Sequence, residues 1–178
     1  MGFRNIHVVI NLGSGKSSVD VDMIRSRLEV SHAAFRIALI EPDSGPEALA
    51  RRAIEEGADL AIAAGGDGAV LGTAEGLMGT VVSLGVIPQG TANVFAAEMG
   101  PPSNSGEAIA LALGDDYEIR TIDTGCVGGK HFLLRVGIGI EAAMTVLAGP
   151  ELKTWFCVFA YMWTAFRLRV RRGGLITS

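Results

Sequence analysis

Cysteine and histidine are scarce in this sequence, and each shortage excludes a class of chemistry. The two cysteines, Cys126 and Cys157, lie far apart in a chain of 178 residues and lack the spacing of a metal site. Two separated cysteines are typical of a reduced, cytoplasmic protein. The three histidines have no partner at a spacing typical of a nucleophilic constellation, so we assign no chemistry to them.

Positive charge and long apolar runs are also scarce. The net charge is -4, which argues against a nucleic-acid-binding protein. The N-terminus has no apolar leader, and the apolar run 155–166 is too short to span a bilayer. Basic residues gather only in segment 151–172, so any attraction to anionic lipid is confined to that segment.

Glycine, by contrast, is abundant: the chain has 24, and many fall between segments of regular pattern. Apolar, β-branched runs alternate with helical patterns through the first part of the chain. The predicted strands are 6–11, 34–40, 58–64 and 81–87, and the predicted helices are 19–30, 47–56, 70–77, 94–99 and 107–113. This alternation predicts an α/β fold, an open parallel sheet with helices on both faces.

The pattern changes near residue 115. Residues 117–127 alternate with period two, Gly128-Gly129 is a hairpin signal, and 131–136 forms the predicted return strand. We therefore expect two domains, 1–115 and an incomplete β-rich 116–178. Because a lone hairpin is marginally stable, we expect the chain to be a fragment or a natural truncation of a longer protein.

Loops 11–17, 64–69 and 88–93 each follow a predicted strand. The carboxyl ends of parallel strands meet at one edge, so we expect a single site there. In the central loop, glycines surround Asp67 before a helix start, which predicts a bend that favours glycine and a cradle for phosphate. Gly15-Lys16-Ser17 suggests a Walker A loop, but Ile10 stands where its first glycine belongs. Another phosphate-near loop and a plain turn remain alternatives.

Taken together, these loops resemble those of the diacylglycerol-kinase-type lipid kinase family, which includes sphingosine and ceramide kinases. The family motifs are Asn-Pro-x-Ser-Gly, Gly-Gly-Asp-Gly-Thr and Pro-x-Gly-Thr-x-Asn-Asp-Phe-Ala. They correspond here to residues 11–15, 65–69 and 88–96. NAD kinases and phosphofructokinases carry loops similar to the second motif, and the third motif selects the lipid-kinase branch. Segments 122–125 and 132–141 also look like the family's entry into its second domain.

The resemblance implies a two-domain kinase that transfers the γ-phosphate of ATP to a lipid hydroxyl. ATP and Mg²⁺ would lie on the nucleotide-binding domain, 1–115, and the lipid against the lipid-side domain, 116–178. Transient contact with a membrane surface is implied as well. The family's base lies beyond Ser178, so we assign no catalytic residue and expect weak or no activity of this chain.

On this resemblance we assign nucleotide binding to residues of all three loops. They are Asn11, Ser14, Gly15, Gly65, Gly66, Asp67, Gly68, Gly90, Thr91 and Asn93. Because two anions at contact repel, Asp67 would hold Mg²⁺ directly or through water, accept a hydrogen bond that fixes its loop, or cap a helix. Thr91 and Asn93 would donate to phosphate oxygens, or form only a turn and a helix cap. Lys16, Asp123 and Glu141 are equally well explained as surface residues.

The chain departs from the family pattern at several positions. Ala69 replaces a threonine and loses a hydroxyl near the phosphates. The other departures are Leu12 for Pro, Leu71-Gly72 for Asn-Glu, Val94 for Asp and Leu134 for Asn. Two alternative functions therefore stay open: a nucleotide-binding module without catalysis, and an NAD-kinase-like enzyme, which residues 90–93 fit poorly.

Segment 152–170 is predicted to be a helix that ends in basic residues and carries several aromatic ones. Such a helix lies at a membrane interface, or it is a core face whose partner strands are missing. In the second case the face would be exposed, or buried in a homo-oligomer. The sequence does not select which lipid is phosphorylated.

Overall fold

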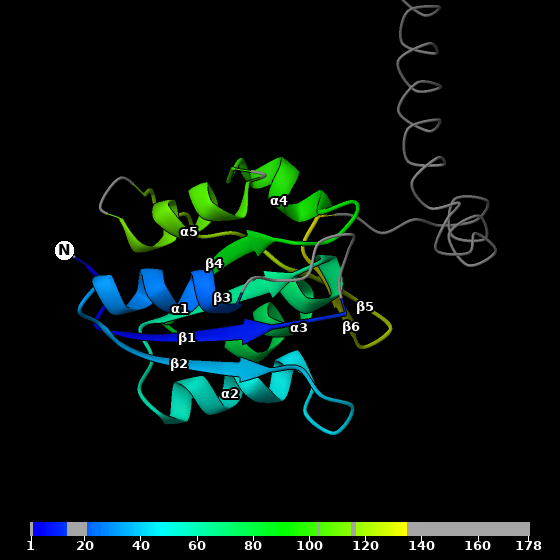
Figure 1. Ribbon diagram of the computed structural model, residues 1–178. Helices are drawn as coiled ribbons and strands as arrows, with labels where there is room; N and C mark the ends of the chain where they lie inside the picture. The colour runs from blue at the N-terminus through cyan, green and yellow to red at the C-terminus, as the bar shows by residue number, and fades with distance from the viewer. Residues whose placement is uncertain (1, 14–20, 103, 115–116, 135–178) are drawn as a thin grey trace, which may run out of the picture. The chain divides into compact units, whose positions relative to one another are not determined.

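The computed structural model describes residues 2–13, 21–102, 104–114 and 117–134 (Figure 1). Four parallel strands form one sheet in the order β2-β1-β3-β4. Their bounds are β1 Asn5–Ile10, β2 Ala34–Leu39, β3 Leu60–Gly65 and β4 Ser83–Pro88. Each strand lies within about a residue or two of its predicted position, because buried parallel strands are short apolar runs. The predicted open parallel sheet is confirmed.

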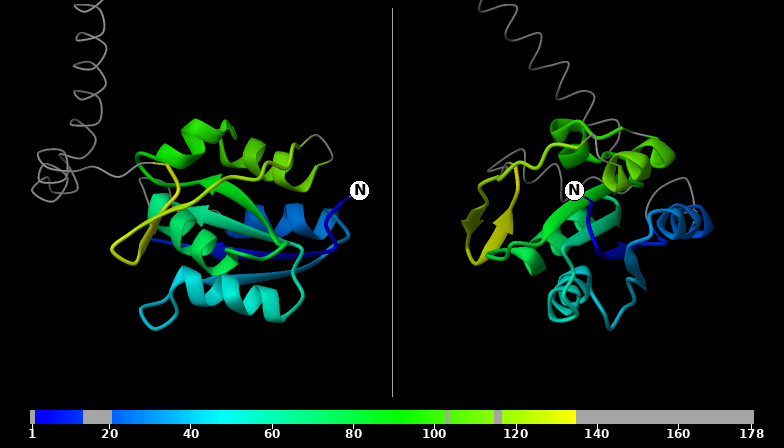
Figure 2. Two further views of the ribbon diagram at one scale, coloured as in Figure 1. Left: turned by 180° about the vertical axis from the view of Figure 1, so that it is seen from behind. Right: turned by 90° about the vertical axis from the view of Figure 1, so that its left-hand side faces the viewer.

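Helices cover both faces of this sheet (Figure 2). Their bounds are α1 Val21–Val30, α2 Pro46–Glu55, α3 Asp67–Leu77, α4 Val94–Met99 and α5 Ser105–Leu113. Alternate side chains of β1, such as Ile6 and Val8, pack with α1 and α5 on one face. On the other face Ala61 packs with α2 and α3, and Ala63 packs with α3 and α4. The period-two alternation of a strand thus divides the core into two layers.

Helices α2 and α3 touch through glycine. A Cβ atom on Gly76 would lie 2.5 Å from the carbonyl oxygen of Glu47 and 2.6 Å from the Cβ of Ala50. A Cβ on Gly72 would collide with the ring of Pro46. The glycine at position 72, where the family pattern has a glutamate, therefore allows α2 to lie against α3.

The hairpin formed by β5, Gly125–Val127, and β6, Lys130–Phe132, turns at the predicted place. Gly128 and Gly129 both have positive φ, which a two-residue hairpin turn requires and glycine supplies. The predicted strand over 117–127 is wrong in extent, since residues 117–124 have no strand pairing. An alternating pattern of apolar and polar residues indicates which side chains face the core. It does not show whether a neighbouring strand is present to form hydrogen bonds.

The described residues up to Leu134 belong to one compact unit that includes the hairpin. A domain boundary near residue 115 stays a prediction. Several other predictions fall outside the described residues. They are the roles of Ser14, Gly15, Lys16 and Glu141, the end of the return strand and the helix over 152–170.

Candidate functional site

The ends of β1, β3 and β4 meet at one edge of the sheet, as predicted. Just beyond the strands, the Asn11 N–H donates to the Ala64 carbonyl at 2.9 Å, and the Gln89 N–H donates to the Gly65 carbonyl at 2.9 Å. These bonds continue the strand ladder into the loops. The structure thereby brings Asn11, the Gly65–Gly68 loop and the Gly90–Asn93 loop to the same edge.

Gly66 and Gly90 meet backbone to backbone. A Cβ on Gly90 would lie 2.6 Å from the Cα of Gly66, and a Cβ on Gly66 would lie 3.3 Å from the Cα of Gly90. Neither has positive φ, and neither do Gly65 and Gly68, so the left-handed bend expected of the glycines around Asp67 is wrong. The close approach of a ligand expected at Gly90 stays a prediction. At Gly66 and Gly90 glycine is needed because the two loops pack directly against each other.

Asn93 braces its own loop. Its Oδ1 accepts from the Gly90 N–H at 2.8 Å, and its Nδ2 donates to the Gly90 carbonyl at 2.7 Å. Its backbone is left-handed, with φ 46°, a conformation that asparagine tolerates better than most residues. Asn93 occupies the N-cap position of α4, but its side chain makes no cap hydrogen bond. The side chain closes the loop instead.

Asp67 is the first residue of α3, and its carboxylate reaches the neighbouring loop. Its Oδ1 accepts from the Phe95 N–H, in the first turn of α4, at 3.1 Å. Gly66 occupies the N-cap position of α3, without a side-chain cap bond. Among the roles considered for Asp67, the structure shows the hydrogen bond that fixes a loop.

The remaining loop residues are more exposed. Asn11 Oδ1 accepts from the Gly13 N–H at 3.0 Å, which holds the first loop in a tight turn. Gly68 and Thr91 are exposed, and a Cβ on Gly68 would meet no atom of the described residues within 4 Å. No described residue fills the space beside Gly68, in the first turn of α3, where a helix carries free N–H groups and the positive end of its dipole.

Gln89 was missed by the sequence reasoning, although it occupies the variable position of the third motif. It is buried, and its Nε2 donates to the Ser105 Oγ at 2.8 Å. This bond ties the end of β4 to the start of α5. A polar residue directly after a buried strand was the signal that could have identified it.

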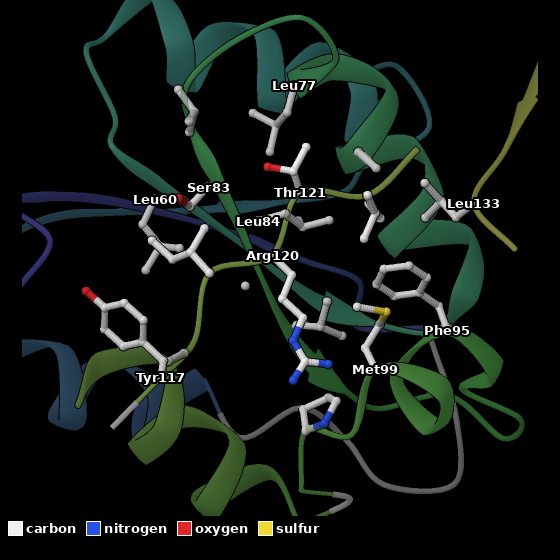
Figure 3. Close-up of a pocket in the computed structure, with 18 of the residues that line it drawn as sticks. Leu60, Leu77, Ser83, Leu84, Phe95, Met99, Tyr117, Arg120, Thr121 and Leu133 are labelled. Atoms are coloured by element: carbon white, nitrogen blue, oxygen red, sulfur yellow. The ribbon is translucent and has the colours of Figure 1, made fainter. Parts of the chain in front are cut away.

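A separate pocket of about 880 Å³ lies beside β4 (Figure 3). Apolar side chains from β4, α3 and α4, including Leu84, Leu77, Phe95 and Met99, form much of its wall, and Arg120 lies among the lining side chains. No described residue of the loops at Gly65–Gly68 and Gly90–Asn93 lines it. Of the lining residues named here, Phe95 and Met99 belong to α4, the helix whose first turn bonds to Asp67.

Shifted pKa values belong to four described groups outside the three loops. Burial lowers the pKa of His7, and a hydrogen bond from Arg52 lowers the pKa of Glu56. In the exposed pair Glu118–Arg120, 2.6 Å apart, the mutual hydrogen bond lowers the pKa of Glu118 and raises that of Arg120. None of these four groups belongs to the three loops of the candidate site.

The described residues contain no group of three or more His, Cys, Asp or Glu side chains that could hold a metal ion. Within the same ranges, no helix has the length and apolar character needed to cross a bilayer.

Comparison with known proteins identifies the family. The diacylglycerol kinase catalytic domain matches residues 5–127, which include β1 to β5 and all the loops described above. The chain belongs to this family. Similar proteins include an uncharacterized Synechocystis protein, 30% identical over 175 residues, which cover 90% of this chain and 40% of that protein. A probable lipid kinase YegS-like protein of Pseudomonas fluorescens is 32% identical over 155 residues, 84% of this chain and 50% of that protein.

The fold of solved diacylglycerol kinases is similar as well. A diacylglycerol kinase from Bacillus anthracis has a TM-score of 0.65 and 24% identity over 74% of this chain and 49% of that chain. The chain thus spans about half the length, or less, of the relatives it matches.

Among the departures from the family pattern, the structure shows how Ala69 and Gly72 pack inside this diacylglycerol kinase domain. Ala69 is buried, 4% exposed, in the first turn of α3, and Gly72 lies against Pro46. Leu12, in contrast, is 52% exposed at the end of β1. The changes at positions 69 and 72 are thus accommodated by packing inside the domain.

Proposed function

We propose that this chain carries the nucleotide-binding site of an ATP-dependent lipid kinase, which transfers the γ-phosphate of ATP to a lipid hydroxyl. The observation that carries the proposal is the meeting of three motif loops at the carboxyl edge of the sheet, directly before the N-terminus of α3. Membership of the diacylglycerol kinase catalytic domain family supports the reaction class.

The phosphates of ATP would bind to backbone N–H groups near Gly66 and Gly68. A helix N-terminus stabilises negative charge through its free N–H groups and its dipole. The open space beside Gly68 leaves room for such a group to approach. The exposed Thr91 hydroxyl supplies a further neutral donor at the same edge. Asn11, Ser14, Gly15, Gly65, Gly90 and Asn93 complete the proposed set.

Mg²⁺ would bind together with the nucleotide. A magnesium ion commonly keeps several water molecules and takes one or two carboxylates in addition to phosphate oxygens, so a single carboxylate suits it. Asp67 is the candidate, and because its Oδ1 is engaged by Phe95, a metal role falls to the second oxygen, acting through water. When bound, the ion neutralises charge on the phosphates.

The lipid and the base complete the proposal. The lipid, a diacylglycerol or a similar alcohol, is expected on the side of residues 116–178, with transient contact at the cytoplasmic face of a membrane. We assign the base to no residue of this chain. Transfer by these 178 residues alone should therefore be weak or absent.

Calorimetry with Mg·ATP, paired with a phosphate-transfer assay on diacylglycerol in detergent micelles, tests this function. Gly68→Val should weaken nucleotide binding at least tenfold without loss of stability, because its side chain enters the open space in front of α3. Gly45→Val is the matched control, since a Cβ there also meets no described atom within 4 Å but lies before α2. Equal binding by both variants would contradict the proposed site.

The same experiment tests the alternatives. Transfer of phosphate to lipid, even weak, would exclude a nucleotide-binding module without catalysis, which the loss of a hydroxyl at Ala69 suggests. Binding without any transfer agrees with both that module and a kinase that lacks its base. Phosphorylation of NAD without phosphorylation of lipid would favour the NAD-kinase-like enzyme.

A further inference from the structure

Helix α4 lacks a local acceptor for its first N–H groups. The first N–H groups of any helix have no partner within the helix, and the N-cap side chain normally satisfies one of them. Here the N-cap residue is Asn93, whose side chain is used on Gly90 instead. The start of α4 must therefore be satisfied from elsewhere.

Asp67 supplies that acceptor from the neighbouring loop. Its Oδ1 lies 3.1 Å from the Phe95 nitrogen, although the two residues are 28 positions apart in the chain. An ionised carboxylate forms a stronger bond to a backbone N–H than a neutral acceptor does. The direct contact of Gly66 with Gly90 brings the two loops close enough for this bond.

Phe95, whose N–H donates to Asp67, also contacts residues outside the two loops. The Phe95 side chain is buried, 8% exposed, and packs with Val70 and Ala63. The same side chain forms part of the wall of the pocket beside β4 (Figure 3). A single carboxylate at the start of α3 therefore holds the helix that carries this wall.

We propose that Asp67 is a positioning residue that couples the Gly65–Gly68 loop to α4, so that the order of α4 and the affinity of the loop for phosphate change together. The first part of this inference stands on the hydrogen bond alone. The second part, affinity for a phosphate ligand, rests on the proposed function.

The test compares two substitutions that differ in one property. Asp67→Asn keeps an oxygen at the Oδ1 position and removes the charge, whereas Asp67→Ala removes the acceptor as well. The matched control is Asp59→Ala. Asp59 also accepts backbone N–H groups, from Arg4 and Asn5, but these lie at the start of β1, the opposite end of the strand from the loops.

Amide hydrogen exchange of the full chain, followed by NMR at the Phe95 N–H, is the direct readout. Asp67→Ala should accelerate this exchange on the order of tenfold, the range expected for losing a hydrogen bond to a charged group. Asp67→Asn should retain most of the protection, and Asp59→Ala should leave it unchanged. Equal protection at Phe95 in the wild type and Asp67→Ala would overturn the proposal.

Calorimetry with ATP in the absence of Mg²⁺ on the same proteins tests the coupling, because the proposed contact of Asp67 with Mg²⁺ then makes no contribution. Asp67→Ala should lose at least tenfold in affinity, and Asp67→Asn should lose less. Fast exchange at Phe95 with wild-type affinity in Asp67→Ala would disprove the coupling. If the wild type binds no ATP, the proposed function fails, and the exchange comparison alone then decides whether Asp67 holds α4.

Discussion

Gly66 and Gly90 face each other across two loops; a Cβ on Gly90 would clash with Gly66, and a Cβ on Gly66 would make a tight contact of 3.3 Å with Gly90. From the sequence, the glycines around Asp67 were expected to adopt positive φ, and Gly90 was expected to allow close approach of a ligand. In the structure neither Gly66 nor Gly90 has positive φ, and the two glycines form a contact between loops. Such a contact joins residues far apart in the chain, so no local pattern reveals it.

Gly90→Ala should therefore destabilise the protein. The added methyl would lie 2.6 Å from the Cα of Gly66 and 2.7 Å from the Oδ1 of Asn93, so one loop must move. We expect a loss of about 1–3 kcal/mol in the free energy of unfolding, measured by urea denaturation. Gly68→Ala, whose Cβ would meet no described atom within 4 Å, serves as the control. An unchanged midpoint for Gly90→Ala would show that the loops do not pack as described.

His7 illustrates a second effect at the scale of single residues. It is buried on β1, with Nε2 3.7 Å from Glu56 Oε2, and Arg36 Nε lies 3.0 Å from the same oxygen. Burial lowers the pKa of His7 below 6.5, although Glu56 acts in the opposite direction, and Arg36 and Arg52 add to the lowering. The imidazole is therefore kept neutral by the fold.

Stability should fall as the pH drops below the ordinary histidine pKa of 6.5, because the unfolded chain then binds a proton that folded His7 resists. The decline from His7 ends once the pH passes its lowered pKa in the folded state. Glu56, whose pKa is lowered chiefly by Arg52, adds a loss as the pH falls from 4.5 through its lowered pKa.

The measurement is urea denaturation of wild type and His7→Gln between pH 7 and pH 5. The variant should show a flatter dependence on pH in this interval. His32→Asn changes an exposed histidine with positive φ and should follow the wild type. A His7→Gln curve parallel to that of the wild type would mean that His7 does not cause the decline.

At the scale of elements, the strands were predictable and the start of α3 was less so. Four largely apolar runs gave the strand positions; β1 and β3 are almost fully buried, whereas β2, at the edge of the sheet, is partly exposed. Helix α3 was expected from Val70 but begins at Asp67, since the Gly66 carbonyl accepts from Ala69 and Val70. Because glycine has a low helix propensity, the sequence pattern did not predict this first turn.

The arrangement of the elements also explains which features of the site could not be predicted from the sequence. The meeting of the three loops at one edge was predictable, because the carboxyl ends of parallel strands always share an edge. The bond from Asp67 to Phe95 depends on how α4 lies against α3, which no motif spacing specifies. The same limit applies to residues 117–124. Their alternating pattern predicted a strand, but such a pattern does not show whether a neighbouring strand is present to pair with it.

The contact between α2 and α3 gives a prediction at this scale. Gly76→Ala places a methyl group 2.5 Å from the Glu47 carbonyl oxygen, and a backbone atom cannot move as easily as a side chain. We expect a net loss of about 1–2 kcal/mol, even though alanine favours helices by about 1 kcal/mol over glycine. Thermal and urea denaturation measure it.

Gly68→Ala in the same helix is the matched control. Its Cβ meets no described atom within 4 Å, so the protein should be equally stable or slightly more so. A gain in stability from Gly76→Ala would contradict close packing of α2 on α3.

At the scale of the whole molecule, the chain is an α/β domain of the diacylglycerol kinase family that spans about half of its relatives. The described residues up to Leu134 form one compact unit, and the described parts of the three motif loops meet at one sheet edge. The central claim is that these loops together form one site for the phosphates of ATP.

Backbone amide chemical shifts during titration with Mg·ATP test that claim most directly. The account predicts that the largest changes occur together at Asn11, Gly66, Gly68, Gly90 and Thr91, from three loops far apart in the chain. Changes confined to residues around the pocket beside β4, such as Leu84 and Ile119, or no changes at millimolar ATP, would contradict it.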